Sequence, residues 1–87
     1  MLPDRVAALI IKDMKLLMVT GYDESFYWTP GGKINDNENH ETCLKRELPE
    51  ELGVELVSMK HYTTFILPNE AKGGEQVNYY YLVEIDS

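Results

Sequence analysis

Glutamates crowd the segment from Glu38 to Glu51, and three of them, Glu47, Glu50 and Glu51, are spaced to share one helix face. Like charges three or four residues apart on a helix cost about a few tenths of a kcal/mol per pair. A solvated helix face is the ordinary explanation for such a run. The alternative is a bound divalent cation, because carboxylate oxygens suit Mg²⁺ and Mn²⁺ and the cation removes the repulsion.

Other residue types that this chemistry needs stand close by in the sequence. Gly31 and Gly32 precede the acidic segment, and glycine lets the backbone come close to a metal or a phosphate because it has no Cβ. Arg46 adjoins Glu47, although an isolated arginine of this kind is ordinarily a surface ion pair that contributes little. Cys43 is predicted to be a small buried residue and not a nucleophile.

Aromatic residues near this segment leave two interpretations open. Trp28 either packs in the core or offers a stacking platform for a base, and the sequence favours neither. The run Tyr79–Tyr81 is predicted to pack within a strand, and one of its rings could face a nucleotide. The sequence does not say which one.

These residues together resemble the signature of the Nudix hydrolase superfamily, G-x5-E-x7-R-E-U-x-E-E-x-G-U, where U is a bulky aliphatic residue. The chain fits it at every specified position, from the first glycine to the last aliphatic residue: Gly32, Glu38, Arg46, Glu47, Leu48, Glu50, Glu51, Gly53 and Val54.

The resemblance implies roles for the matched residues. Arg46, Glu47, Glu50 and Glu51 are the expected catalytic residues. The same three glutamates are the expected ligands of Mg²⁺, or of Mn²⁺. A backbone carbonyl of Gly32 or its neighbour would be a further ligand.

The remaining expected site residues have less direct roles. The resemblance implies that Arg46 orients Glu47 through a charge-assisted bond. Glu38 and Gly31 are expected to support the metal site. Trp28 and Lys33 are weaker candidates for binding the substrate.

The expected activity is Mg²⁺-dependent hydrolysis of a nucleoside diphosphate linked to another moiety. The stretch YWTPGGKI, residues 27–34, resembles the corresponding segment of MutT-type nucleoside triphosphate pyrophosphatases. A nucleoside triphosphate is therefore the first expected substrate. Pro68 lies about where ADP-ribose pyrophosphatases carry a proline, so ADP-ribose or an ADP-sugar is the alternative. A truncated, non-catalytic Nudix module that binds a nucleotide or a protein partner is the third possibility.

The elements that must position these residues form an α+β domain. Two apolar runs, Val6–Ile11 and Lys15–Val19, predict strands covered on both faces around a turn at Lys12-Asp13. Residues 26–32 predict a short aromatic segment, and residues 55–67 and 77–85 predict two further strands.

A single helix is expected to carry the glutamates. Asn39 is a strong N-cap, the stripe Leu44, Leu48 and Leu52 gives one apolar face, and Gly53 ends the helix. Pro49 interrupts this pattern, because it cannot donate a hydrogen bond to the Lys45 carbonyl. It is expected to kink the helix or to cost roughly 3 kcal/mol.

Length and charge set the outer limits of the interpretation. The 87 residues, with a net charge of −7 and a single cysteine, predict one domain over residues 1–87, without a disulfide. No Lys/Arg cluster favours a nucleic acid polymer, and no apolar run is long enough to cross a membrane, so a cytoplasmic location is expected.

One face of the expected Nudix-type mixed sheet lacks a covering helix. Nudix domains usually carry a second helix over the other face of the sheet, and this chain ends before it. The chain is therefore expected to be a fragment or to have a partner over that face, and we predict a homodimer or higher oligomer because an uncovered apolar face promotes association.

Overall fold

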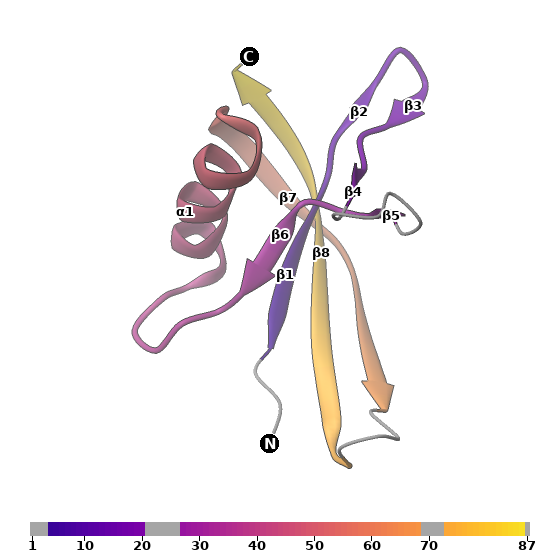
Figure 1. The fold of residues 1–87 in the computed structure, drawn as a ribbon, viewed down its shortest axis with the longest axis vertical. Helices are drawn as coiled ribbons and strands as arrows, with labels where there is room; N and C mark the ends of the chain where they lie inside the picture. The colour runs from indigo at the N-terminus through magenta and orange to yellow at the C-terminus, as the bar shows by residue number, and fades with distance from the viewer. Residues whose placement is uncertain (1–3, 21–26, 69–72, 87) are drawn as a thin grey trace.

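A four-stranded mixed sheet forms the centre of the computed structural model, which describes residues 4–20, 27–68 and 73–86 (Figure 1). The strand order is β6 (Gly31–Lys33), β1 (Arg5–Leu9), β8 (Glu75–Asp86) and β7 (Glu55–Pro68). β1 runs parallel to β8, whereas the β1–β6 and β7–β8 pairs are antiparallel. The predicted α+β class with a mixed Nudix-type sheet and one helix is confirmed.

The predicted pair of long N-terminal strands is instead divided among short ones. β2 (Ile11–Lys12) pairs with β3 (Lys15–Leu16), and β4 (Val19–Thr20) pairs with β5 (Tyr27–Trp28). The β2–β3 hairpin turns at Asp13 and Met14, whose φ angles are 53° and 63°, one residue later than predicted. A two-residue hairpin turn of this kind needs positive φ at both central residues.

The expectation that both faces of this region are covered is wrong for the hairpin. Ile11 is 61% exposed and Met14 is 97% exposed, because the hairpin projects beyond the four-stranded sheet (Figure 1). Sequence periodicity identified the apolar run but not the point at which it leaves the core.

The helix α1 (His40–Leu52) begins and ends where the sequence predicts. The Asn39 side chain caps its N-terminus by accepting a hydrogen bond from the Thr42 N–H at 2.8 Å. Gly53 ends it in the left-handed conformation, with φ of 67°, and its N–H donates to the Pro49 carbonyl at 3.0 Å.

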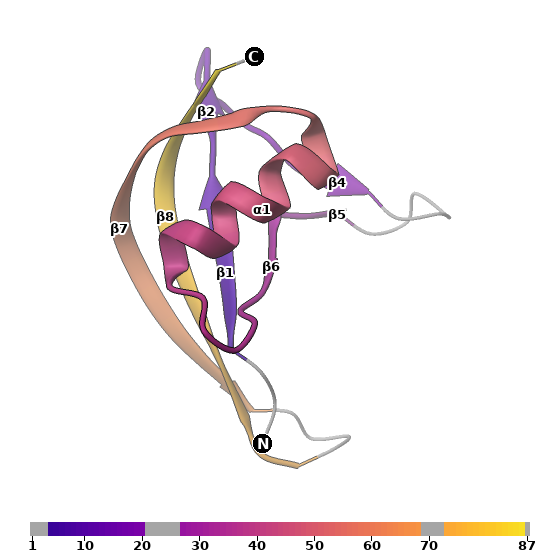
Figure 2. The same ribbon diagram turned by 90° about the vertical axis from the view of Figure 1, so that its left-hand side faces the viewer.

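Pro49 does not interrupt the helix. Three further helical residues follow it, and α1 is drawn as one continuous helix in Figures 1 and 2. Because Pro49 lies in the last turn, the hydrogen bond that it cannot donate is lost close to the helix end.

The helix packs on one face of the sheet, which we call the covered face (Figure 2). Leu44 and Leu48 are fully buried there against Val6 and Val83, as the predicted apolar stripe requires. The opposite face, here called the open face, has no helix over it among the described residues. No helix in the described part of the chain is long and apolar enough to cross a membrane.

Candidate active site

The C-terminal half of α1 brings two of the predicted glutamates against the edge strand β6. The Gly31 N–H donates to Glu51 Oε1 at 2.9 Å. A Cβ on Gly32 would lie 2.5 Å from the Glu47 carboxyl carbon, so the Glu47 carboxylate packs directly on the Gly32 backbone. Glu47 and Glu51, one helical turn apart, therefore contact two consecutive residues of β6, Gly32 and Gly31.

Gly31 holds this strand close to its neighbour. Its φ angle is 141°, in a region that L side chains rarely adopt, and a Cβ there would lie 2.1 Å from the Val6 carbonyl oxygen. The two glycines therefore have separate reasons to be glycine. Gly31 is required by the sheet, and Gly32 makes room for a functional carboxylate.

The pKa of the Glu51 carboxyl is raised above its ordinary value by burial and by a neighbouring carboxylate. Desolvation where it contacts β6 raises its pKa, the Gly31 N–H opposes that rise, and the nearby Glu47 carboxylate raises the pKa further. Two carboxylates that face each other in this way favour a cation between them.

Arg46 is the centre of the hydrogen-bond network beside these carboxylates. It donates to both oxygens of Glu38, at 2.8 and 3.0 Å, to Glu47 Oε1 at 2.6 Å, and to the Lys33 carbonyl at 3.0 Å. These partners raise the Arg46 pKa, so the guanidinium stays charged. The predicted charge-assisted bond between Arg46 and Glu47 is present.

Glu38 supports this network through Arg46. The Arg46 bonds, followed by the Asn35 N–H at 2.8 Å, lower the Glu38 pKa to about 2. Both of its carboxylate oxygens are thereby engaged, so its supporting role in this structure is to fix the guanidinium that holds Glu47.

The third predicted carboxylate stands apart from the other two. The Glu50 side chain is 63% exposed and lies 3.9 Å from Arg46 Nη1. Among the described residues, no three His, Cys, Asp or Glu side chains converge into a complete metal-binding cluster. The donor set nevertheless suits a hard cation: two carboxylates with backbone groups beside them, and a further, largely exposed carboxylate on the same helix.

The structure distributes the remaining candidates around this centre. Cys43 is buried beneath the network, and desolvation raises its pKa to about 11, so the thiol stays protonated as expected for a packing residue. Trp28 lies on β5, half-exposed, in the small sheet that β5 forms with β4. The Lys33 carbonyl serves Arg46, and its residue pairs with Arg5 in the sheet.

Sequence reasoning missed Arg5. Its Nη2 donates to the Thr29 carbonyl at 3.1 Å, and its charge lowers the pKa of Glu51. The one available signal was a positively charged residue at the start of the first strand. Its proximity to Glu51 could not be inferred before the pairing of β1 with β6 was known.

The structure also shows which face of the sheet each tyrosine of Tyr79–Tyr81 occupies. Tyr79 and Tyr81 contact the His40 ring on the covered face, and the His40 ring nitrogen Nδ1 lies 2.5 Å from the Tyr81 hydroxyl. Tyr80 therefore points to the open face.

Comparisons with known proteins agree with this arrangement. The sequence model of the NUDIX domain family matches residues 1–87. A curated relative from Buchnera aphidicola subsp. Schizaphis graminum, named 8-oxo-dGTP diphosphatase, is 34% identical over 61 residues, which are 66% of this chain and 47% of that protein.

Solved structures give a similar result. A MutT NUDIX hydrolase from Burkholderia pseudomallei superposes with a TM-score of 0.85 at 25% identity, covering 98% of this chain and 69% of that one. The E. coli ORF135 protein gives 0.81 at 27% identity, with 98% and 63% covered. The chain thus spans about half the length of the curated relative that it matches and under three quarters of these two structures.

Proposed function

This chain belongs to the NUDIX domain family, and on that premise we propose that it is a divalent-metal-dependent hydrolase of a nucleoside diphosphate linked to another moiety. The observation that carries the proposal is the placement of Glu47 and Glu51 against the two glycines of β6, with Arg46 fixing Glu47. An acidic face that served only for solvation would have no reason to pack two carboxylates on glycine backbone.

Each residue has a defined part in this proposal. Glu47, Glu51 and, after turning inward, Glu50 would hold Mg²⁺ or Mn²⁺, with a backbone carbonyl of Gly31 or Gly32 beside them. When bound, the cation offsets pyrophosphate charge and acidifies a water. Arg46 keeps Glu47 in one rotamer, and Glu38 keeps Arg46 in place.

Glu51 is the best candidate for accepting a proton from the attacking water. Its carboxyl pKa is raised by desolvation, which makes it a stronger base than an ordinary glutamate. Its hydrogen bond from Gly31 holds the carboxylate at the strand edge, where a phosphate chain can approach the backbone.

A nucleoside triphosphate is the proposed substrate class. The MutT-type segment at residues 27–34 supports it, as does the similarity to a protein named 8-oxo-dGTP diphosphatase. ADP-ribose or an ADP-sugar is the alternative. A non-catalytic nucleotide-binding module is the other alternative.

Product analysis tests the proposal directly. The chain would be incubated with Mg²⁺ and separately with dNTPs, 8-oxo-dGTP, ADP-ribose, NADH and diadenosine polyphosphates. We expect one class to yield a nucleoside monophosphate. Glu51→Gln should lower the rate by roughly 10²- to 10⁴-fold, whereas Glu41→Gln is the matched control because Glu41 lies on the same helix and pairs only with Lys45 among the ion pairs described. If nucleotide and Mg²⁺ bind but no substrate is hydrolysed, the result would contradict the proposed activity and favour the non-catalytic module.

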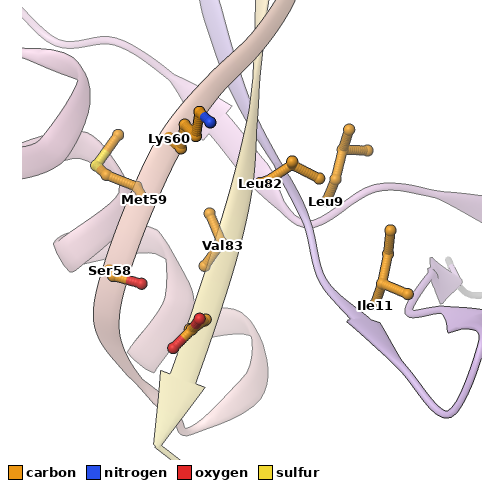
Figure 3. Close-up of a pocket in the computed structure, with 8 residues that line it drawn as sticks. Leu9, Ile11, Ser58, Met59, Lys60, Leu82 and Val83 are labelled. Carbon is orange, nitrogen blue, oxygen red and sulfur yellow. The ribbon is translucent and has the colours of Figure 1, made fainter.

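Self-association is the second part of the proposal. An open groove of about 510 Å³ lies where β2 diverges from β8, and its lining combines apolar residues with charges of both signs (Figure 3): Leu9, Ile11, Ser58, Met59, Lys60, Leu82, Val83 and Glu84. Because Lys60 and Glu84 have opposite charges on one surface, two copies related by a two-fold axis could pair them. A monomeric mass in light scattering at micromolar concentration would contradict this part.

A further inference from the structure

β6 is joined to β1 by backbone contacts that begin one residue before the strand itself. The Ala8 N–H donates to the Pro30 carbonyl at 2.8 Å, and the ladder then pairs Gly31 with Ala7. Two glycines follow Pro30, and glycine has more conformational freedom than any other residue. The position of the Gly31 N–H therefore depends on how firmly its neighbours are held.

Arg5 adds a side-chain bond at the residue that precedes Pro30. Its backbone pairs with Lys33 at the far end of β6, whereas its guanidinium Nη2 donates to the Thr29 carbonyl at 3.1 Å. One residue of β1 thus holds the chain on both sides of the two glycines. A hydrogen bond from an ionised donor is stronger than one between neutral groups, so this bond restrains the Thr29 carbonyl effectively.

The Gly31 N–H is the group that this restraint places. It donates to Glu51 Oε1 at 2.9 Å, and Glu51 is a proposed metal ligand. Desolvation raises the Glu51 pKa and the Arg5 charge opposes that rise, so the guanidinium lies near this carboxylate. Arg5 is therefore connected to Glu51 by two routes, one through the backbone of residues 29–31 and one directly through its charge.

We propose that Arg5 is a positioning residue of the candidate metal site, which keeps the Gly31 N–H against Glu51 by fixing the Thr29 carbonyl. This rests on the proposed function only in taking Glu51 as a metal ligand. The bond from Arg5 to Thr29 is made within the protein and needs no substrate. Groups that hold metal ligands in place in this way lower metal affinity when they are removed.

The two routes from Arg5 to Glu51 predict changes of opposite sign in metal affinity. A guanidinium near carboxylates repels a divalent cation, so if Arg5 acted by charge alone its removal should strengthen metal binding. If Arg5 positions Glu51 through Gly31, its removal should weaken metal binding, because the ligand is no longer held in place. The proposal requires the weaker binding.

Amide hydrogen exchange tests the position of the Gly31 N–H without metal or substrate. The variant is Arg5→Met, which keeps a long side chain on the sheet but removes the guanidinium. Exchange at Gly31 should become roughly tenfold faster, while the amides of the β7–β8 pair keep their wild-type protection. A uniform loss of protection across the sheet would show that Arg5 only stabilises the fold, and it would overturn the proposal.

Mn²⁺ alone is the probe for the second measurement, titrated by calorimetry without nucleotide. Arg5→Met should weaken Mn²⁺ binding by roughly 10- to 100-fold. Arg5→Lys keeps a positive charge but lacks the guanidinium fork, so its loss should be smaller. Tighter Mn²⁺ binding by Arg5→Met would overturn the proposal in favour of a purely electrostatic role.

Lys12→Met is the matched control for both measurements. Lys12 is an exposed cation of the β2–β3 hairpin, outside the four-stranded sheet, and its replacement removes the same charge as Arg5→Met does. It should leave the exchange of Gly31 and the affinity for Mn²⁺ unchanged. An equal change in this variant would show that the effect comes from net charge, and it would contradict the positioning role.

These measurements separate the role of Arg5 from the proposed activity. If Arg5→Met accelerates exchange at Gly31 and weakens Mn²⁺ binding while no substrate in the panel is hydrolysed, the activity fails and the positioning role stands. If the wild-type chain hydrolyses a substrate and Arg5→Met leaves exchange at Gly31 unchanged, the activity stands and the positioning role is overturned. A wild-type chain that binds no Mn²⁺ would overturn the link between Arg5 and a metal site.

Discussion

The two faces of the central sheet differ in what completes them. On the covered face, α1 buries Leu44 and Leu48 fully and brings Glu47 and Glu51 to β6, so one helix provides both the core and the candidate metal ligands. On the open face, Leu82 and Phe65 remain in contact with solvent. The stability of this chain should therefore depend more on the covered face than on the open face.

The difference is largest for leucine truncation. Leu48→Ala removes a fully buried side chain and should cost about 2–5 kcal/mol in the free energy of unfolding. Leu82→Ala removes a side chain from the open face and should cost less than about 1 kcal/mol. Chemical denaturation of both variants measures the contrast. Equal losses would mean that the open face is covered in solution, as self-association would cause.

The covered face is also the one whose structure could be predicted. The Asn39 cap, the leucine stripe and the Gly53 stop are local signals, and each is read from residues within one turn of its effect. The network of Arg46 with Glu47 could be predicted because adjacent helix residues and a matched family signature fix both ends of it.

The arrangement of side chains on the open face could not be predicted, because it depends on strand pairings that the sequence does not specify. Three consecutive tyrosines alternate between faces whichever face is buried, so only the pairing of β8 with β1 and the position of α1 assign Tyr80. Arg5 acquires its role through two strand pairings of long sequence separation. The hairpin at Asp13 and Met14 was displaced by one residue because several turn positions suit the same apolar run.

The two glycines of β6 should differ in what an added Cβ disturbs, because Gly31 packs against the sheet and Gly32 packs against a candidate metal ligand. Gly31→Ala places a Cβ against the Val6 carbonyl at a strained φ angle, so it should destabilise the fold by roughly 3 kcal/mol. Gly32→Ala meets only the end of the Glu47 side chain, which can move away. It should cost roughly 1 kcal/mol or less of stability while weakening Mg²⁺ binding.

Thermal unfolding with and without Mg²⁺ separates the two effects. Gly31→Ala should lower the melting temperature in both conditions. Gly32→Ala should unfold near the wild-type temperature without Mg²⁺ and lose most of any stabilisation that Mg²⁺ gives. The opposite pattern would place the functional carboxylate somewhere other than over Gly32.

The smallest expected effect is the pH dependence contributed by Glu38. Its folded-state pKa of about 2 lies below the ordinary value of 4.5, so its contribution to stability is fully present above pH 4.5 and is lost as the pH falls towards 2. Glu38→Gln lacks that titration, and the difference in melting temperature between wild type and variant should shrink across this interval. The largest cause is the Arg46 guanidinium and the second is the Asn35 N–H, so in an Arg46→Gln background the same substitution should give a difference that depends much less on pH. A pH dependence of undiminished size without Arg46 would show that the guanidinium is not what lowers the Glu38 pKa.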